Sequence, residues 1–413
     1  MIPIIVLALV FILIIIRRIG KFRFQIWQIM ALGAFAVLVT LQISPLNALK
    51  AINLDVIFFL FGTFIVGEAL ENSGYLSFLS YRLFGRAKSL DSLILFILFG
   101  MGISAAFLMN DTLAIIGTPV VLLLARKAQT TPKILLLALA FAVTIGSVTS
   151  PIGNPQNLLI AINGNVANPF ITFFRYLLLP TLINLLAAYF LLRLFYRKHF
   201  DHQILSNHPE EIKDPELARL SQISLVLLAV LILVKIITVF AGLKIEFRLT
   251  YIALTAALPV IIFSPKRLTI IRRIDWTTLI FFASMIILMA SVWNSGVFQN
   301  VITSTNMTLT SVPVIMGISV VLSQFISNVP LVGLYLPMLM KLGVTGAGLM
   351  ALAAGSTIAG NLSILGAASN VIIIQNAEQK SGETLTFWEF VRIGAPLTAV
   401  NIFIYWVFFM IIK

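Results

Sequence analysis

Long apolar runs cover most of the chain, and short basic or polar segments separate them. Runs of this length predict helices that cross a lipid bilayer. The first run, IPIIVLALVFILIII, follows no soluble domain and precedes no small-residue cleavage site, so we interpret it as a membrane helix rather than a removed signal peptide. The pattern therefore predicts an all-α polytopic membrane protein.

Four stretches rich in Gly, Pro, Asn, Ser and Thr interrupt the apolar runs, at 109–113, 147–157, 326–330 and 360–370. In hydrocarbon every backbone N–H and C=O group must be paired, so unwound chain is tolerated only inside protein or beside a water-filled cavity. Each interruption also creates two half-helix ends, whose free N–H groups favour anions and whose free carbonyl groups favour cations. Broken helices of this kind are typical of secondary transporters.

Basic residues predict the orientation of these runs. Six clusters hold 21 of the 28 Lys and Arg residues, at 17–23, 82–88, 126–133, 193–219, 266–273 and 380–392. The positive-inside rule places all six in the cytoplasm. We therefore expect a multi-pass protein of the cell inner (plasma) membrane, with the N-terminus outside and a linker at 197–220 in the cytoplasm.

This orientation predicts two re-entrant helical hairpins. Segment 92–126 must leave and return to the cytoplasmic face, yet only 13 residues separate Thr112 from Arg126. They make about 20 Å of helix, against a hydrocarbon core of roughly 30 Å, so we place the tip of a hairpin near Asn110–Thr112. Two full spans joined by a short outer turn are the alternative. By the same reasoning, segment 312–341 forms a second hairpin that enters from outside, with ISNVP at its tip.

Three pairs of segments repeat in the same order along the chain. ENSGYL at 71–76 resembles WNSGVF at 293–298, and NDTLAIIGTP resembles NVPLVGLYLP. TIGSVTSPIGNPQN at 144–157 aligns without gaps to TIAGNLSILGAASN at 357–370, at a constant offset of 213 residues. With the opposite orientations from the charge pattern, these pairs predict two inverted-topology repeats, each with a re-entrant hairpin and a broken transmembrane helix.

The repeats predict a division of the chain into two halves. The first half, 1–196, would comprise scaffold helices at 1–90, the hairpin at 92–126, a broken helix at 133–163 and a span at 170–196. After the linker at 197–220, the second half, 221–413, would comprise scaffold helices at 221–292, the hairpin at 312–341, a broken helix at 346–378 and the last span at 393–412.

Composition agrees with this picture and excludes several functions. The 413 residues are 60% hydrophobic and only 10% charged, whereas soluble domains average roughly 25% charged residues. The absence of cysteine excludes disulfides, thiolate metal sites and thiol nucleophiles. The net charge of +13 comes from the cytoplasmic segments and not from a nucleic-acid-binding surface. The three histidines lie in the polar linker, in a solvated setting, so we predict no metal and no cofactor beyond a coupling ion.

Two hairpin tips and two broken helices can enclose one central binding site. Its candidate residues are Asn110, Asp111 and Thr112 at the first tip; Ser147, Thr149, Ser150, Gly153 and Asn157 in the first break; Ser327 and Asn328 at the second tip; and Asn361, Ser363, Gly366 and Asn370 in the second break. Asn, Ser and Thr oxygens can bind a small cation or hydrogen-bond an oxyanion. The alternative is that these residues only cap helices or allow close packing. Asp111 is the only charge between Asp91 and Arg126, and we predict it as the proton-coupling residue.

The four segments, in this order, resemble the ion transporter superfamily, which includes the ArsB arsenite permeases, the NhaD sodium/proton antiporters and the divalent anion/sodium symporters. MNDTLAIIGTP and ISNVPLVGLYLP are similar to its hairpin tips, and TSPIGNPQNLLI to its first broken helix. GNLSILGAASNVII is similar to its second broken helix, especially in the ArsB/NhaD branch. The resemblance implies an elevator-type carrier, with ion sites between each tip and the adjacent broken helix.

The tips depart from one branch of that superfamily. The sodium-coupled dicarboxylate branch has Ser-Asn-Thr at both tips, whereas this chain has Met109-Asn110-Asp111 and Ser327-Asn328-Val329. The two ion sites are therefore not expected to be equivalent, and an acid at one tip suits proton coupling.

These observations lead us to expect proton-coupled efflux of arsenite or antimonite, bound as a neutral hydroxide by Asn, Ser, Thr and backbone groups. The alternatives are sodium/proton antiport through Asp111, and Na⁺- or H⁺-coupled transport of a carboxylate or another oxyanion. A passive channel is a further alternative, whereas the absence of any catalytic constellation argues against an enzyme. The expected partners are a small inorganic solute, a coupling ion and the lipid bilayer; an ATPase subunit and a homodimer are left open.

Overall fold

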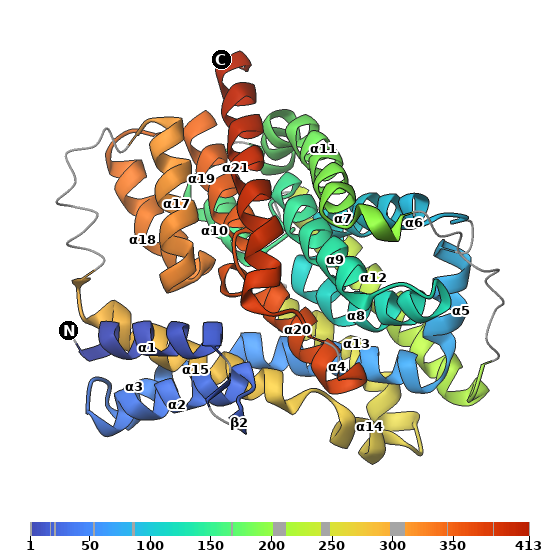
Figure 1. The fold of residues 1–413 in the computed structure, drawn as a ribbon. Helices are drawn as coiled ribbons and strands as arrows, with labels where there is room; N and C mark the ends of the chain where they lie inside the picture. The colour runs from blue at the N-terminus through green and yellow to red at the C-terminus, as the bar shows by residue number, and fades with distance from the viewer. Residues whose placement is uncertain are drawn as a thin grey trace.

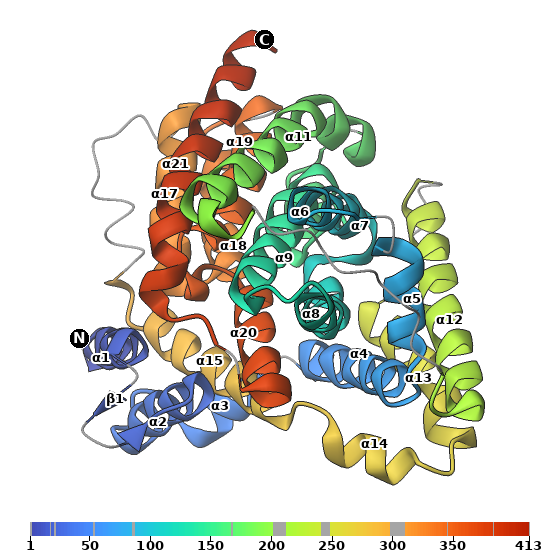
Figure 2. The same ribbon diagram turned by 45° about the vertical axis from the view of Figure 1, so that its right-hand side comes forward.

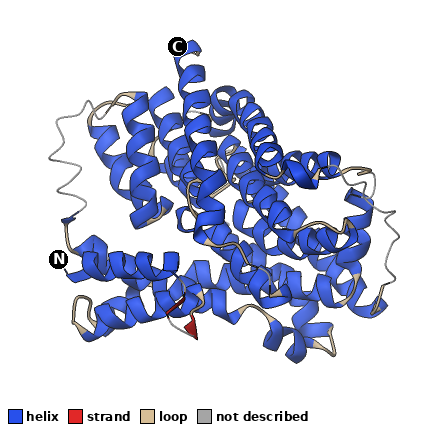
Figure 3. Ribbon diagram, in the orientation of Figure 1, coloured by secondary structure: helices blue, strands red, loops and turns tan. Residues whose placement is uncertain are grey.

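The computed structural model describes residues 2–412, apart from 17, 20–21, 53, 85–86, 167, 201–211, 241–247, 298–309, 345 and 383. Helices make up nearly all of this part of the chain (Figure 3). Two strands of two residues each, β1 (Arg18–Ile19) and β2 (Phe22–Arg23), pair in an antiparallel manner. The predicted all-α fold is confirmed.

Six helical segments in the described residues are long and apolar enough to cross a membrane, namely Leu90–Leu108, Pro132–Thr149, Pro169–Phe195, Pro215–Lys235, Trp276–Asn294 and Phe387–Ile411. A bent pair, Pro45–Ala51 with Leu54–Asn72, would make a seventh span. Both numbers agree with the predicted polytopic membrane protein.

One group of helices forms the lower layer and the right-hand edge of the molecule (Figures 1 and 2). The group comprises α1 (Ile2–Ile16), α2 (Ile26–Val39), α3 (Pro45–Ala51), α4 (Leu54–Asn72), α5 (Tyr75–Phe84), α12 (Pro215–Phe240), α13 (Leu249–Phe263), α14 (Arg267–Arg273) and α15 (Trp276–Asn294). We call it the scaffold layer, because it contains the segments predicted as scaffold helices. Helix α4 crosses α13 so closely that a Cβ atom on Gly62 would lie 2.7 Å from the carbonyl oxygen of Ala253.

The remaining helices form a second body above the scaffold layer (Figure 1). From the first half it contains α6 (Leu90–Phe96), the π-helical turn η1 (Ile97–Met101), α7 (Gly102–Leu108), α8 (Asn110–Lys127), α9 (Pro132–Gly146), the 3₁₀ turn η2 (Ser147–Thr149), α10 (Pro155–Asn163), α11 (Pro169–Phe195) and the turn η3 (Arg197–His199). From the second half it contains α17 (Val312–Ile326), α18 (Asn328–Lys341), α19 (Ala347–Ile358), the turns η4 (Ala359–Asn361) and η5 (Ile364–Gly366), α20 (Ala368–Ser381) and α21 (Phe387–Ile411).

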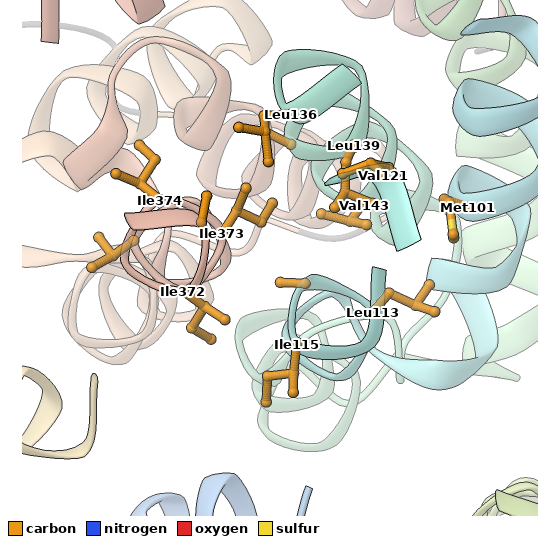
Figure 4. Close-up of a cluster of buried hydrophobic side chains, with 14 of the residues drawn as sticks. Met101, Leu113, Ile115, Val121, Leu136, Leu139, Val143, Ile372, Ile373 and Ile374 are labelled. Carbon is orange, nitrogen blue, oxygen red and sulfur yellow. The ribbon is translucent and has the colours of Figure 1, made fainter. Parts of the chain in front are cut away.

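Helix α20 joins the two halves within this body. Its residues Ile372, Ile373 and Ile374 are buried in an apolar cluster with residues of α8 and α9, among them Leu113 and Leu136 (Figure 4). Within a bilayer, close packing of such side chains, rather than their removal from water, favours helix association. A helix from the second half therefore completes the core of the first.

The segments predicted as hairpins and linker contain well-defined helices in the described residues. The segment predicted as the first hairpin contains two helical arms that meet at Met109, and the second contains α17 and α18, which meet at Ser327. Helix α12 begins at Pro215, inside the segment predicted as linker, most of which lies outside the described residues. The entry of the two hairpins from opposite membrane faces stays a prediction.

Candidate functional site

The two hairpin tips have the same backbone conformation. Met109 has φ +64° and ψ 145°, and Ser327 has φ +66° and ψ 160°. Positive φ is uncommon for residues other than glycine. In each case the next residue, Asn110 or Asn328, begins a helix, so the tips lie where the polar residues predicted them.

The first break ends at a capped helix. The side chain of Asn154 accepts a hydrogen bond from the backbone N–H of Asn157, at 2.9 Å, and Pro155 is the first residue of α10. Asn is a favoured N-cap residue and Pro is favoured at the first helical position. The helix therefore restarts at Pro155, behind the Asn154 cap.

Asn157 holds the unwound chain together. Its side-chain amide donates to the carbonyl oxygens of Ser147, Val148 and Ser150, at 3.1, 3.3 and 3.0 Å. These carbonyl groups have left the helix, and the amide supplies the partners that they need in a dry interior. Asn157, a predicted binding residue, thus has a clear structural role.

The hydroxyl groups of the first break bond mostly to nearby backbone. Ser147 Oγ donates to the carbonyl of Thr144 at 3.0 Å, and Thr149 Oγ1 donates to that of Gly146 at 2.9 Å. Ser150 Oγ accepts a bond from the backbone N–H two residues later, at 3.3 Å. For these three predicted residues the geometry matches the capping alternative.

The second break repeats the hydrogen bonds of the first at the offset of 213 residues. The side-chain amide of Asn370 donates to the carbonyls of Gly360 and Ser363, at 2.5 and 3.3 Å. These positions correspond to Asn157 and to two of the three carbonyls that it binds. The backbone N–H of Gly366 donates to the carbonyl of Ser363 at 3.1 Å, and Gly153, its counterpart in the first break, makes the equivalent bond at 3.2 Å.

Side chains outside the two repeated break segments provide hydrogen-bond partners for the second break. Gln324 of α17 accepts a bond from the hydroxyl of Ser363 at 2.7 Å and donates to the carbonyl of Ala359 at 2.9 Å. Asn361 donates to Asn401 of α21 at 2.8 Å, and Asn401 donates to Asn184 of α11, also at 2.8 Å. Single amides in apolar helices gave no distinctive sequence signal, so these partners were not predicted.

A cavity of about 550 Å³ lies where the tips and breaks meet the scaffold layer. Its polar lining includes Asn110 and Asp111 of the first tip, Ser327 and Asn328 of the second, and Gln156 of α10. Its far wall is apolar and consists of Ala51, Val56, Phe282, Met285, Ile286, Met289, Ala290 and Trp293. Four predicted site residues therefore come together at one cavity.

The other predicted residues lie behind this surface. Thr112 is buried in the first turn of α8, and the lining residues of the cavity do not include the predicted residues of either break. Gly153 and Gly366 are sites of close packing, because a Cβ atom would lie 2.2 Å from the carbonyl oxygen of Ser147 and 2.4 Å from that of Ala359. The breaks thus line the cavity only through Pro155, Gln156 and Ala368, and their predicted residues support it from behind.

The electrostatics of the cavity combine four helix ends with one acid. Helices α8, α10, α18 and α20 each present at least one of their first two residues at the cavity, so four amino ends converge there. Each end carries a partial positive charge of about half an elementary charge. No Lys or Arg is among the described lining residues.

Two oxygen atoms at this cavity have no partner among the described residues. They are Asp111 Oδ1 and Asn328 Oδ1, and both are buried. Asn110 instead uses its side-chain oxygen to accept a bond from the backbone N–H of Asp111, at 2.9 Å. A buried polar atom without a partner is costly, so both atoms are available to a ligand or, at Asp111, a proton.

The sequence matches known transporters over most of its length. Residues 9–348 match the CitMHS family, described as citrate transporter. An uncharacterized transporter of Mycobacterium bovis is 29% identical over 85% of this chain and 84% of its own length. The silicon efflux transporter LSI3 of Oryza sativa subsp. japonica is 27% identical over 89% of both chains. The crystal structure of the Alcanivorax borkumensis YdaH transporter aligns with 99% of this chain and 96% of that one, at 14% identity and a TM-score of 0.49.

Proposed function

The chain belongs to the CitMHS citrate transporter family, and from this premise we propose that it exports a small uncharged inorganic hydroxide, such as arsenite or antimonite, in exchange for protons. It is a polytopic membrane transporter and not an enzyme. The solute, the coupling ion and the direction are the proposed part. The ArsB/NhaD branch and the plasma membrane stay predictions, and an ATPase subunit and a homodimer stay open.

The unpaired carboxylate oxygen of Asp111 is the observation that carries this proposal. It lies at the cavity with no hydrogen-bond donor among the described residues. A buried carboxylate needs a compensating charge or hydrogen bond. A proton satisfies it in one state, and the hydroxyl of a bound solute satisfies it in the other, so binding of solute and proton would exclude each other.

The remaining polar groups suit a neutral hydroxide. The amides of Asn110, Asn328 and Gln156 offer donors and acceptors around one volume. A neutral hydroxide with several O–H groups can use both, and it brings no charge that the described lining would have to balance. The silicon efflux activity in the name of LSI3 supports a solute of this type.

A carboxylate such as citrate is the second candidate. The four helix amino ends favour an anion, and the family's own description is citrate transporter. Against it, Asp111 would repel a carboxylate while ionised, and no described lining residue is a Lys or Arg. Sodium/proton antiport through Asp111 is the third candidate.

Flux measured with the purified protein in lipid vesicles tests these candidates. Arsenite, citrate and Na⁺ are compared one at a time, with and without an imposed pH gradient. We expect arsenite to move only when a pH gradient is imposed, and protons to move in the direction opposite to arsenite. Gradient-driven citrate or Na⁺ movement without arsenite movement would show that the proposed solute is wrong.

A further inference from the structure

Thr357 of α19 joins the first break to the second half of the chain. Its hydroxyl accepts bonds from the side-chain amides of Asn154 and Gln156, at 3.2 and 3.5 Å, and donates to the side-chain oxygen of Asn157 at 3.3 Å. All four side chains are at least 97% buried. The Thr357 hydroxyl is therefore fully used.

The counterpart of Thr357 at the offset of 213 residues is Thr144, in the last turn of α9. The counterparts of Asn154, Gln156 and Asn157 are Ala367, Ser369 and Asn370. Ala367 has a methyl group where Asn154 has an amide, and Ser369 has a short hydroxymethyl group where Gln156 has an amide. The second arrangement thus has less side-chain volume than the first.

The shorter side chains coincide with unpaired oxygen atoms. Thr144 Oγ1, Ser369 Oγ and Asn370 Oδ1 are buried and have no partner among the described residues. Thr144 and Ser369 are at most 1% exposed, as is Asn370. Three unpaired buried oxygens at corresponding positions are unusual, because buried polar atoms are nearly always hydrogen-bonded.

Gly360 places these groups close together. The position of a Cβ atom on Gly360 lies 3.6 Å from Thr144 Oγ1 and 2.6 Å from the Cβ atom of Ala367. The carbonyl of the same glycine accepts the amide of Asn370 at 2.5 Å. Thr144, the cap residue Ala367 and the amide of Asn370 therefore lie around the same glycine. The repeat places Ser369 beside Thr144, as Gln156 lies beside Thr357 in the first break.

We propose that a small monovalent cation binds between Thr144, Ser369 and Asn370. Hydroxyl and amide oxygens are hard neutral ligands of the kind that bind such ions, and unwound backbone carbonyls and helix carboxyl ends serve the same purpose in transporters. The carboxyl end of α9 contributes partial negative charge, while the amino end of α20 offsets it. With no acidic side chain in the group, a divalent ion would not recover its dehydration cost.

This site is separate from the cavity. None of its three residues is among the cavity-lining residues, and none lies at a hairpin tip. The cation would take the place that Asn154 and Gln156 fill in the first break. It would thereby fasten α20 to α9 without contact with the transported solute.

Thermal unfolding of the purified protein tests the proposal, without solute and at constant ionic strength. The midpoint Tm is measured in NaCl, LiCl and KCl against N-methylglucamine chloride. We expect one alkali cation to raise the Tm of the wild type by a few degrees in a saturable manner. Thr144→Val and Ser369→Ala should each raise the half-saturating cation concentration about tenfold or more. Failure of every alkali cation to raise the Tm, as expected if only water fills the site, would overturn the proposal.

A double substitution that copies two side chains of the first break into the second provides the matched variant. In Ala367→Asn/Ser369→Gln, the new amides should occupy the site, so the cation should no longer raise the Tm, while the Tm in N-methylglucamine chloride stays at or above that of the wild type. Thr357→Val is the control: it should lower the Tm in all salts alike and leave the half-saturating concentration unchanged. Cation dependence that survives Thr144→Val and the double substitution, or that is lost in Asp111→Asn, would place the ion elsewhere. No solute is present, so failure of this proposal leaves the flux test unaffected.

Discussion

The backbone N–H of Asn110 donates to the carbonyl oxygen of Gly153 at 3.0 Å. This bond ties the first hairpin tip to the first break, so the position of Asp111, the next residue, depends on the conformation of the break. A substitution at Gly153 therefore tests whether the break positions Asp111.

Gly153→Ala should disrupt the site. The new methyl group would lie 2.2 Å from the carbonyl oxygen of Ser147, which cannot move freely because Asn157 also binds it. We expect a loss of about 1–3 kcal/mol in stability and of most solute flux, measured by Tm and vesicle transport. Gly317→Ala in α17, where no heavy atom lies within 4 Å, is the control and should retain both. Normal flux in Gly153→Ala would show that the break does not set the tip.

Asp111→Asn should separate transport from the proton gradient. The amide keeps the size of the side chain but cannot bind and release a proton. We expect solute to move down its own gradient at a rate that no longer depends on the pH difference. Asp91→Asn is the matched control, because Asp91 lies at the start of the same hairpin and pairs with Tyr189 and Arg193. An unchanged pH dependence in Asp111→Asn would reject Asp111 as the coupling residue.

Lys380→Met should weaken the contact between α20 and the scaffold layer. Lys380 Nζ lies 2.9 Å from Glu68 Oε2 and also pairs with Glu71, both on α4. The substitution leaves two partly buried carboxylates beside each other, so we expect a cost of about 2 kcal/mol, seen as a lower Tm. Adding Glu68→Gln and Glu71→Gln to this variant should restore part of the lost stability. Lys341→Met, at an exposed site, should stay within about 0.5 kcal/mol of wild type.

The same ion pairs predict a dependence on alkaline pH. Burial by itself lowers the pKa of Lys380, but the carboxylates of Glu71 and Glu68 outweigh it and hold that pKa above its ordinary value of 10.5. Their stabilising contribution should be complete below about pH 10.5 and be lost as the pH rises further. The Tm difference between wild type and Lys380→Met should therefore be constant near neutral pH and shrink above this value.

Asp214 should stabilise the start of α12 at neutral but not at acidic pH. Its carboxylate accepts the backbone N–H of Leu217 at 3.0 Å and pairs with Lys266 at 2.6 Å. These two contacts, the first foremost, hold the pKa of Asp214 below its ordinary value of 3.8. Asp214→Ala should cost about 1 kcal/mol at pH 7, and the difference in Tm should disappear as the pH falls below 3.8. Asp214→Asn keeps a capping side chain and should cost less.

The places where helices break could be read from the sequence, because Gly, Pro and Asn act locally. Helices α8 and α18 begin at Asn110 and Asn328, as the motifs suggested. The choice between Asn154 and Asn157 as the cap could not be made, because two Asn residues three positions apart both fit the local pattern. In the folded break the side-chain amide of Asn157 binds three carbonyl groups, and Asn154 serves as the cap.

The partners that hold the breaks in place depend on tertiary packing. Thr357 and Gln324 lie in apolar helices whose patterns do not indicate what they face. Lys380 and Glu68 are 312 residues apart, and nothing in their local sequence indicates that they pair. Such contacts follow from how helices far apart in the sequence pack together, which composition and spacing do not determine.

The bonds from Thr357 to the first break have a consequence for biogenesis. Asn154 and Thr357 are 203 residues apart, so most of the second half must be synthesised and inserted before the hydroxyl can reach its partners. Until then three buried amides of the first break lack that bond. The first break therefore gains its last hydrogen-bond partner only when α19 packs against it.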